Sequence, residues 1–349
     1  MTSRDTISRL LACAIITIGA VGLSGLSFAQ NANQKADQAE TGASIDLYIG
    51  YTAGGGYDVY ARALARHLER HIPGHPTILT KNMPGAGSLV LANWLYNVAP
   101  KDGSAFGMIG RGIAFDPLLG STKAQFDASK FNWIGSMNDE VSVCVAWHTT
   151  GITKLQQVVD KPLVVGGTGS AADTDQFPKV LNGVLGTKFK VVSGYPGGNE
   201  IDLAMERGEV QGRCGWSWSS VVATHKSWLE EKKINVLVQL SMHKHPDLPD
   251  VPLIMDFANT DEARQIFKLI FSRQPMGRPF LAPPGVPAER VAMLRKAFKE
   301  TLKDKEFLAD AERMKLEINA VSGEDVQNIV NEVYSTPKAV AKKAAEMIN

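Results

Sequence analysis

The clearest candidate for chemistry in this chain is a glycine-rich loop that reads Tyr51-Thr-Ala-Gly-Gly-Gly-Tyr-Asp58. It stands between a predicted strand and a predicted helix, and its three consecutive glycines let a ligand approach the backbone closely. The first N–H groups of a helix have no partner inside it, and the helix dipole places about half a positive charge there. The loop therefore predicts a site for a carboxylate or phosphate. Because Asp58 would repel an anion, we interpret its carboxylate first as a helix cap and only second as a ligand contact.

Two further loops follow predicted strands in the same half of the chain. Asn82-Met-Pro-Gly-Ala-Gly-Ser88 offers close approach at its glycines, and Ser88 can cap the next helix or contact a ligand. Gly110-Arg111-Gly112 supplies an arginine, whose guanidinium suits bidentate binding of a carboxylate. A surface role for Arg111 is the alternative, since most arginines are exposed. Together the three loops predict one anion-binding site at the edge of the sheet.

The second half of the chain contributes two more candidate loops. Gly166-Gly-Thr-Gly-Ser170 follows a predicted strand and supplies amides and hydroxyls, although many such loops are only tight turns. Cys214-Gly-Trp-Ser-Trp-Ser219 follows another strand and brings Trp216 toward a cleft. With Tyr51 and Tyr57, Trp216 would give the ligand an aromatic lining; packing inside a lobe is the alternative.

Enzyme motifs are missing from the sequence. The run of glycines at 54–56 is not G-x-G-x-x-G, and neither a P-loop nor a G-x-S-x-G motif occurs. His67 and His71 stand four residues apart on a predicted helix, with His75 beyond it, but they do not form H-E-x-x-H. Surface histidines explain this pattern better, as they explain His243 and His245. We therefore predict no catalytic residue, no metal site and no cofactor.

The N-terminus has the layout of a cleaved secretory signal peptide over residues 1–29. Arg4 and Arg9 precede an apolar run that ends in Ser27-Phe-Ala29, a small-x-small cleavage site. An uncleaved anchor is the alternative, although the run barely reaches the length of a membrane span. Residues 30–44 have almost no large apolar side chain, which predicts a disordered leader. Cleavage would take the net charge from +1 to zero, so nothing indicates a nucleic-acid partner.

Two cysteines, Cys144 and Cys214, remain after such cleavage. Export to an oxidising compartment would permit a disulfide between them. Both also stand in apolar strand-like segments, where a free cysteine packs as a small apolar residue. Spacing alone leaves both states open.

Alternating short apolar runs and helical stripes predict an α/β fold. The remaining 305 residues exceed one hydrophobic core and predict two lobes, each a mainly parallel sheet flanked by helices. The expected strands are 45–49, 76–80, 105–109, 163–166, 189–192, 210–214 and 236–240, and the expected helices are 59–72, 88–98, 175–185, 199–206, 287–302, 304–314, 323–334 and 337–347.

Several motifs, in this order along residues 45–349, resemble the substrate-binding receptors of tripartite tricarboxylate transporters, or Bug receptors. They are the Ala53–Asp58 loop, the Asn82–Gly87 turn, Leu248-Pro-Asp-Val-Pro252 and Ala282-Pro-Pro-Gly-Val-Pro287. The resemblance implies a two-lobed periplasmic-binding-protein fold that holds a carboxylate between its lobes through backbone amides and ordered water. It implies a periplasmic, monomeric, non-catalytic receptor with a small organic acid as ligand and the membrane permease subunits as partners.

The resemblance also implies domain limits and contacts. Lobe 1 would comprise 45–145 and 278–349, and lobe 2 would comprise 146–277, with hinge crossings near Val145 and Arg278. Contacts would come from the loops already described: Ala53, Gly54, Gly55, Gly56, Tyr57, Asp58, Gly85, Ala86, Gly87 and Ser88 in lobe 1, and Thr168, Gly169 and Ser170 in lobe 2. The chain departs from the family at Ser193–Gly197 and at Gly277-Arg278, so the ligand's identity does not transfer. A ligand sensor for a signalling kinase, and less so a hydrolase or lyase of small acids, are the alternatives.

Overall fold

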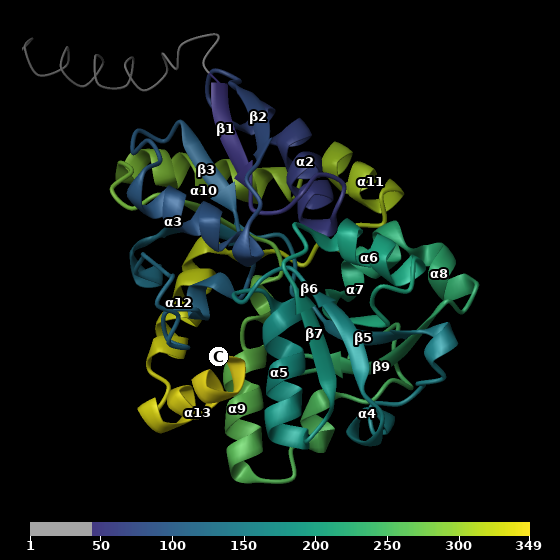
Figure 1. Ribbon diagram of the computed structural model, residues 1–349. Helices are drawn as coiled ribbons and strands as arrows, with labels where there is room; N and C mark the ends of the chain where they lie inside the picture. The colour runs from purple at the N-terminus through teal and green to yellow at the C-terminus, as the bar shows by residue number, and fades with distance from the viewer. Residues whose placement is uncertain (1–43) are drawn as a thin grey trace, which may run out of the picture.

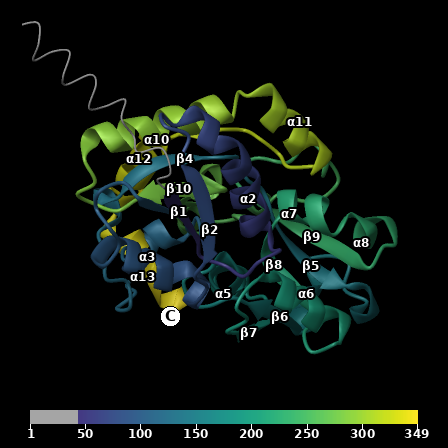
Figure 2. The same ribbon diagram turned by 90° about the horizontal axis from the view of Figure 1, so that it is seen from above.

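The computed structural model describes residues 44–349, which form two lobes with a sheet in each (Figure 1, Figure 2). The predicted signal peptide and nearly all of the predicted leader lie outside the described residues. Within 44–349, no helix combines the length and apolar character that crossing a bilayer requires.

The first lobe is built on a six-stranded mixed sheet in the order β11-β4-β10-β3-β1-β2. β1 runs parallel to β2 and β3, whereas β10 runs antiparallel to β3 and β4. Alternate residues of β1, namely Ile45, Leu47 and Ile49, are buried on one face of the sheet, while those between them are only partly buried on the other face. The strands are β1 (Ser44–Ile49), β2 (Thr77–Asn82), β3 (Ala105–Met108), β4 (Asn132–Ser136), β10 (Pro279–Ala282) and β11 (Val321–Ser322).

Helices cover both faces of this sheet (Figure 2). In the first of them, Tyr60, Leu64 and Leu68 are buried at a spacing of four residues, which places them on one helix face. The helices are α2 (Gly56–Leu68), α3 (Leu89–Asn97), α10 (Ala288–Thr301), α11 (Lys305–Arg313) and α12 (Gly323–Tyr334).

The second lobe has a five-stranded mixed sheet in the order β7-β6-β8-β5-β9. β6 runs parallel to β7 and β8, and β5 runs antiparallel to β8 and β9. The strands are β5 (Ser142–Trp147), β6 (Leu163–Gly167), β7 (Phe189–Ser193), β8 (Gly212–Ser217) and β9 (Ile234–Leu240), and the helices are α4 (Gln157–Asp160), α5 (Asp173–Leu185), α6 (Gly198–Glu206), α7 (Trp218–Thr224), α8 (Lys226–Glu230) and α9 (Asp261–Phe271). Short 3₁₀ segments lie at Glu69–His71, Ala86–Ser88, Ile113–Phe115, Ala128–Lys130, His148–Thr150, Ile254–Phe257 and Gln274–Met276.

The predicted two-lobed α/β fold is confirmed. Both sheets are mixed, because the strand that follows each crossing runs antiparallel to its neighbours. β5 and β10 directly follow the two crossings between lobes, and each runs antiparallel to its neighbours. Neither strand was among the expected strands, although the segment around Cys144 was predicted to be strand-like. Most of their residues are buried on both faces, and a short run of this kind has no alternating pattern to reveal it.

The first crossing lies earlier than the sequence indicated. Val145 is in the middle of β5, a strand of the second lobe, so the chain leaves the first sheet after Ser136 and crosses at 137–141. In the structure the chain returns to the first sheet through Gly277 and Arg278, just before β10. The two crossing segments are hydrogen-bonded to each other, because Gly277 N donates to Asn138 O at 3.0 Å and Met137 N to Arg278 O at 3.2 Å.

The last helix also changes the predicted division. α13 (Lys338–Ile348) was assigned to lobe 1, but it lies against α5 and α9 of the second lobe (Figure 1). Its Ala341, Ala344 and Ile348 are buried there. The structure therefore sends the chain across the lobes a third time, between α12 and α13.

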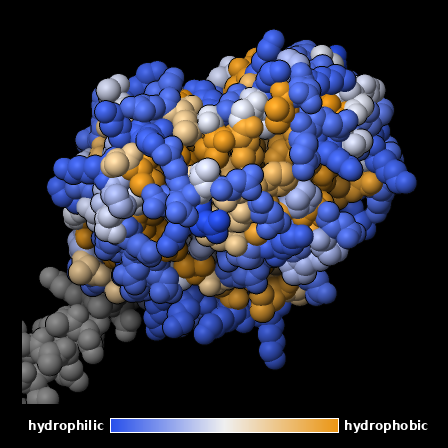
Figure 3. Space-filling view, turned by 90° about the horizontal axis from the view of Figure 1, so that it is seen from below, coloured by the Kyte–Doolittle hydropathy of each residue, from blue (hydrophilic) through white to orange (hydrophobic). Residues whose placement is uncertain are grey.

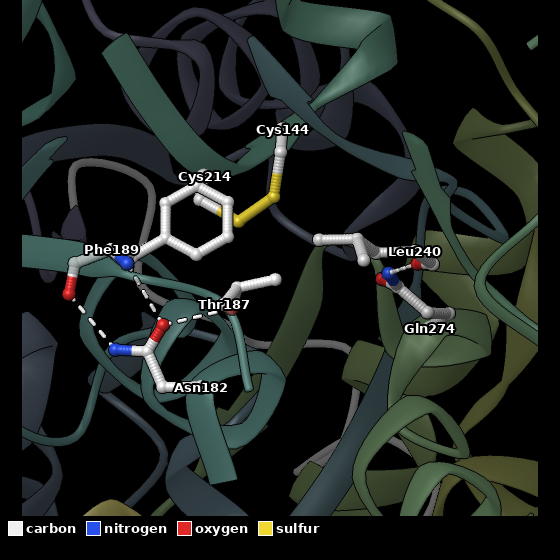
Figure 4. The surroundings of a disulfide bond; sticks show 7 residues. All are labelled: Cys144, Asn182, Thr187, Phe189, Cys214, Leu240 and Gln274. Carbon is white, nitrogen blue, oxygen red and sulfur yellow. Dashed lines mark hydrogen bonds between the residues drawn. A yellow bond between two sulfur atoms is a disulfide. The ribbon is translucent and has the colours of Figure 1, made fainter. Parts of the chain in front are cut away.

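Cys144 on β5 and Cys214 on β8 are register partners in neighbouring strands, and the structure joins them in a disulfide (Figure 4). Both are fully buried in the core of the second lobe. Phe189 lies beside them, held by Asn182, which accepts a hydrogen bond from Phe189 N at 2.9 Å and donates to Phe189 O at 2.8 Å. The bridge fixes two central strands of the sheet that carries one wall of the cavity described next.

Candidate ligand-binding site

A cavity of about 50 Å³ lies between the two lobes. Seven of the predicted contact residues line it: Tyr51, Gly55, Gly56, Tyr57, Arg111, Thr168 and Trp216. Ser217, from the candidate loop Cys214–Ser219, also lines it. The lining further includes residues that the sequence did not single out, chiefly Ala172, Asp173, Thr174, Gly198, Asn199, Asp202, Arg213 and Ser220.

Three helix N-termini converge on this cavity. Gly55 and Gly56 open α2, Ala172 and Asp173 open α5, and Gly198 opens α6, and all of these line the cavity. The first N–H groups of each helix are not used inside the helix, and each dipole contributes a partial positive charge. α2 comes from the first lobe and α5 and α6 from the second, so helix N-termini from both lobes meet at the cavity.

Arg111 is one of four charged residues of the lining, with Asp173, Asp202 and Arg213. It is buried rather than exposed, with only 2% of its surface accessible. Its Nε donates to Asp173 Oδ2 at 2.7 Å, and its Nη2 donates to Ser217 Oγ at 2.7 Å. Burial opposes the charge, but Tyr57, Asp173 and Glu140 together raise the pKa of Arg111. The third nitrogen, Nη1, is buried without a hydrogen-bond partner among residues 44–349. Nη1 is therefore a charged hydrogen-bond donor without an acceptor among these residues.

Tyr51 and Tyr57 form one wall of the cavity, stacked with ring centroids 4.6 Å apart. Tyr51 donates to Gly87 O at 3.2 Å, and the Tyr57 hydroxyl accepts from Arg111 N at 3.3 Å. Burial raises the pKa of Tyr51 well above its usual value, so the hydroxyl stays a donor. These contacts tie the first glycine loop to the second and third.

Trp216 and Arg213 line the cavity from β8 of the second lobe. The Arg213 guanidinium lies 4.6 Å from the Trp216 ring centroid and donates to Asp202 Oδ1 at 2.9 Å. Its Nε is buried with no partner among the described residues. The predicted aromatic lining is thus accompanied by a second guanidinium that was missed, because Arg213 precedes Cys214 in a strand and no local signal marks its orientation.

Arg278 and Glu140 form a fully buried ion pair beneath the cavity, with Nη1 3.2 Å from Oε2. Arg278 also donates to Ser219 Oγ at 2.9 Å and Ser220 Oγ at 2.8 Å, and its guanidinium lies 4.7 Å from the ring of Tyr57. Burial disfavours ionised Glu140, but Arg278 and Arg111 keep its pKa below the usual value. Arg278, a departure from the family pattern, thus links the hinge crossing to α7.

Asp58 has a structural role in the loop, but it is not the N-cap residue that the sequence suggested. The N-cap of α2 is Gly55, and Asp58 lies inside the first turn. Its carboxylate accepts from Gly54 N at 2.9 Å, Asn82 Nδ2 at 2.8 Å and Arg62 Nε at 2.9 Å. Ala53, Gly54 and Asp58 do not line the cavity; this network instead shapes the loop that does.

The second and fourth glycine loops meet each other rather than line the cavity. Gly87 N donates to Thr168 O across the lobes at 2.9 Å. A Cβ on Gly87 would lie 2.7 Å from Ala172 N, and one on Gly169 would lie 2.7 Å from Ala86 Cα. Ser88 Oγ accepts from Gly110 N at 2.7 Å. These loops let the lobes touch backbone to backbone; Gly85, Ala86, Gly87, Ser88, Gly169 and Ser170 are outside the lining.

No family model matches the chain. A curated relative, the "UPF0065 protein in gbd 5'region" of Cupriavidus necator, is 24% identical over 309 residues, which are 86% of each chain. Among solved structures, the periplasmic binding protein BugD has a TM-score of 0.71 at 19% identity, over 86% of this chain and 97% of its own. MatC from Rhodopseudomonas palustris, solved with malate, has a TM-score of 0.68 at 18% identity, over 86% and 99%.

The fold and the interlobe cavity therefore define a two-lobed periplasmic-binding-protein architecture. Its similarity to BugD and to the UPF0065 protein confirms the resemblance predicted from the glycine-loop and proline motifs.

Proposed function

We propose that this protein is an exported solute-binding receptor that captures a small carboxylate between its lobes and delivers it to a tripartite tricarboxylate-type permease. The observation that carries the proposal is the convergence of three helix N-termini on one buried cavity, together with the unpartnered Nη1 of Arg111. Unused amides and a buried guanidinium are the donors that suit a carboxylate. The similarity to MatC, which was solved with malate, and to BugD supports this ligand class and a periplasmic location.

Capture works by closure. In an open form, the α2 amides of the first lobe would receive the carboxylate, and approach of the second lobe would add the α5 and α6 amides. Arg111 belongs to the first lobe, yet it contacts Asp173 and Ser217 of the second. It would therefore contact the ligand and hold the closed form with the same guanidinium. Nothing in this scheme requires a covalent step, and we propose a non-catalytic role.

A thermal-shift screen of C4 to C6 dicarboxylates, followed by calorimetry, tests this function. We expect at least one acid to bind the wild type saturably and Arg111→Gln to weaken it by about tenfold or more, since a hydrogen bond to a charged group contributes about 1.5–3 kcal/mol. Arg295→Gln, on an arginine remote from the cavity, is the matched control and should bind normally.

Equal affinity in the Arg111→Gln and wild-type proteins would remove Arg111 from the site. Turnover of any bound acid by the purified protein would contradict the non-catalytic proposal.

A further inference from the structure

A larger hollow of about 540 Å³ lies away from the interlobe cavity, on the side of α9 and α13. Its walls come from α9, from the segment after β9 (Ser241 to His243), from Gln274 and Pro275, and from α12 and the start of α13. We call it the α9–α12 groove. Figure 3 views the molecule from below, the side on which α9 and α13 lie in Figure 1, and shows hydrophobic residues reaching the surface among hydrophilic ones.

Gln274 brings a hydrogen-bond acceptor without a donor to the lining of the groove. Its side chain is 1% exposed and lines the groove. Its Nε2 donates to Leu240 O (Figure 4), but its Oε1 is buried with no partner among residues 44–349. A buried acceptor left unsatisfied costs about 1–3 kcal/mol, so a donor that reaches Oε1 would be stabilised there.

The rest of the lining is mainly apolar. Leu269 and Val333 are buried in opposite walls, and Ile329, Val340 and Pro275 are partly buried around them. The two charged side chains at the rim are Lys268 on α9 and Glu332 on α12. The volume falls within the range of small-molecule sites, and an apolar wall with a few placed polar groups is their usual composition.

We propose that the α9–α12 groove is a second binding site, for a small molecule with an apolar body and a hydrogen-bond donor directed at Gln274 Oε1. Alcohols, amides and protonated amines carry such a donor. A carboxylate carries only acceptors at neutral pH, so this site selects against the ligand class proposed for the interlobe cavity.

The position of the groove links it to the hinge. Gln274 O accepts from Glu140 N at 3.0 Å, and Glu140 is the partner of Arg278 in the crossing segments. The walls come from both lobes, with α9 in the second and α12 in the first. If the proposed function holds, an occupant bridging these walls would change carboxylate affinity, and the effect would be reciprocal. Binding in the groove itself does not depend on that function.

The test uses four probes with one apolar body and different head groups: benzyl alcohol, benzylamine, benzoate and toluene. Methionine methyl groups labelled with ¹³C report on the site, because Met242 lines the groove whereas Met293 does not. We expect saturable shifts at Met242, but not at Met293, with benzyl alcohol and benzylamine. The affinities of toluene and benzoate should be lower by about fivefold or more, as the loss of one hydrogen bond predicts.

Two variants isolate the groove. Gln274→Met keeps an unbranched side chain without the acceptor and should abolish the preference for benzyl alcohol over toluene. Val340→Trp fills the groove from the partly exposed side of α13 and should abolish all Met242 shifts, whereas Val98→Trp, on the surface of the other lobe, should not. Arg111→Gln should leave the probes bound, which separates this site from the interlobe one.

Strongest binding by benzoate would mean that Lys268 rather than Gln274 sets the chemistry and would overturn the proposal. So would the absence of any saturable Met242 shift with all four probes.

Discussion

At the scale of single residues, the glycines of the predicted site divide into two roles. Gly55 and Gly56 bring unused helix amides to the cavity, whereas Gly87 and Gly169 let the lobes touch. Gly56 has both roles, because a Cβ there would lie 1.9 Å from Ser220 Oγ of the other lobe. A Cβ on Gly55 would meet nothing closer than 3.8 Å. A side chain at Gly56 would therefore collide with the other lobe, whereas one at Gly55 would not.

We predict that Gly56→Ala obstructs closure and Gly55→Ala does not. Overpacking costs about 1–3 kcal/mol, so Gly56→Ala should lower carboxylate affinity by roughly tenfold. Calorimetry and small-angle scattering with ligand should show weaker binding and a more open shape for Gly56→Ala only. Adding Ser220→Gly should restore closure; two alanine variants with identical affinity would refute the steric argument.

At the scale of elements, the histidines considered for a metal site join α2 and its 3₁₀ extension to α11. His67 Nε2 lies 3.1 Å from Asp310 Oδ2, and His71 Nε2 lies 2.8 Å from Asp304 Oδ2. No cluster among residues 44–349 has the composition of a metal site. At Asp304, burial is outweighed by the hydrogen bonds from His71 and from the Glu306 and Phe307 amides, which lower its pKa to about 2. Arg66 and His67 lower the pKa of Asp310 to about 2.

These two carboxylates should make the α2–α11 contact acid-sensitive. A pKa below the unfolded value of 3.8 means that the stabilisation is complete above about pH 4 and is lost as the pH falls toward about 2. In urea unfolding between pH 2 and 6, the Asp304→Asn/Asp310→Asn double variant should be less stable than wild type at pH 6 and converge with it near pH 2. Asp250→Asn, at an exposed loop position, is the control; a constant difference across the range would contradict the assignment.

At the scale of the whole molecule, α13 adds contacts between the two lobes beyond those of the two crossing segments. Its Ala344 is fully buried against the second lobe, and Lys343 pairs with Glu262 of α9. Asn349, just past the helix, donates to Leu119 O of the first lobe at 3.1 Å. The C-terminal helix therefore holds both lobes beside the α9–α12 groove.

We expect Ala344→Asp to lower the free energy of unfolding by roughly 3 kcal/mol, because it buries a charge without a partner. Ala339→Asp, on the exposed side of the same helix, should change it by about 0.5 kcal/mol or less. Urea denaturation of both variants measures the difference. Similar stabilities would show that α13 does not pack against the second lobe.

The sequence by itself determined the features that depend on neighbouring residues. The strand, glycine loop and helix order at Tyr51 to Asp58 placed unused amides at a helix start, and the predicted helices end within a few residues of the observed ones. Periodicity and turn chemistry are local, so they can be read from the chain. They could not show that β5 and α13 belong with the second lobe, because that membership rests on long-range packing and strand pairing.

Only the tertiary structure decided which loop residues line the cavity and which press the lobes together. Arg111 meets Asp173 across 62 residues of sequence, and Arg278 meets Glu140 across a crossing that the sequence placed too late. The N-termini of α5 and α6 are part of the cavity lining because the packing of the second lobe against the first places them beside the start of α2. Such contacts depend on how two separately folded sheets approach each other, and no local pattern of residue types records that distance.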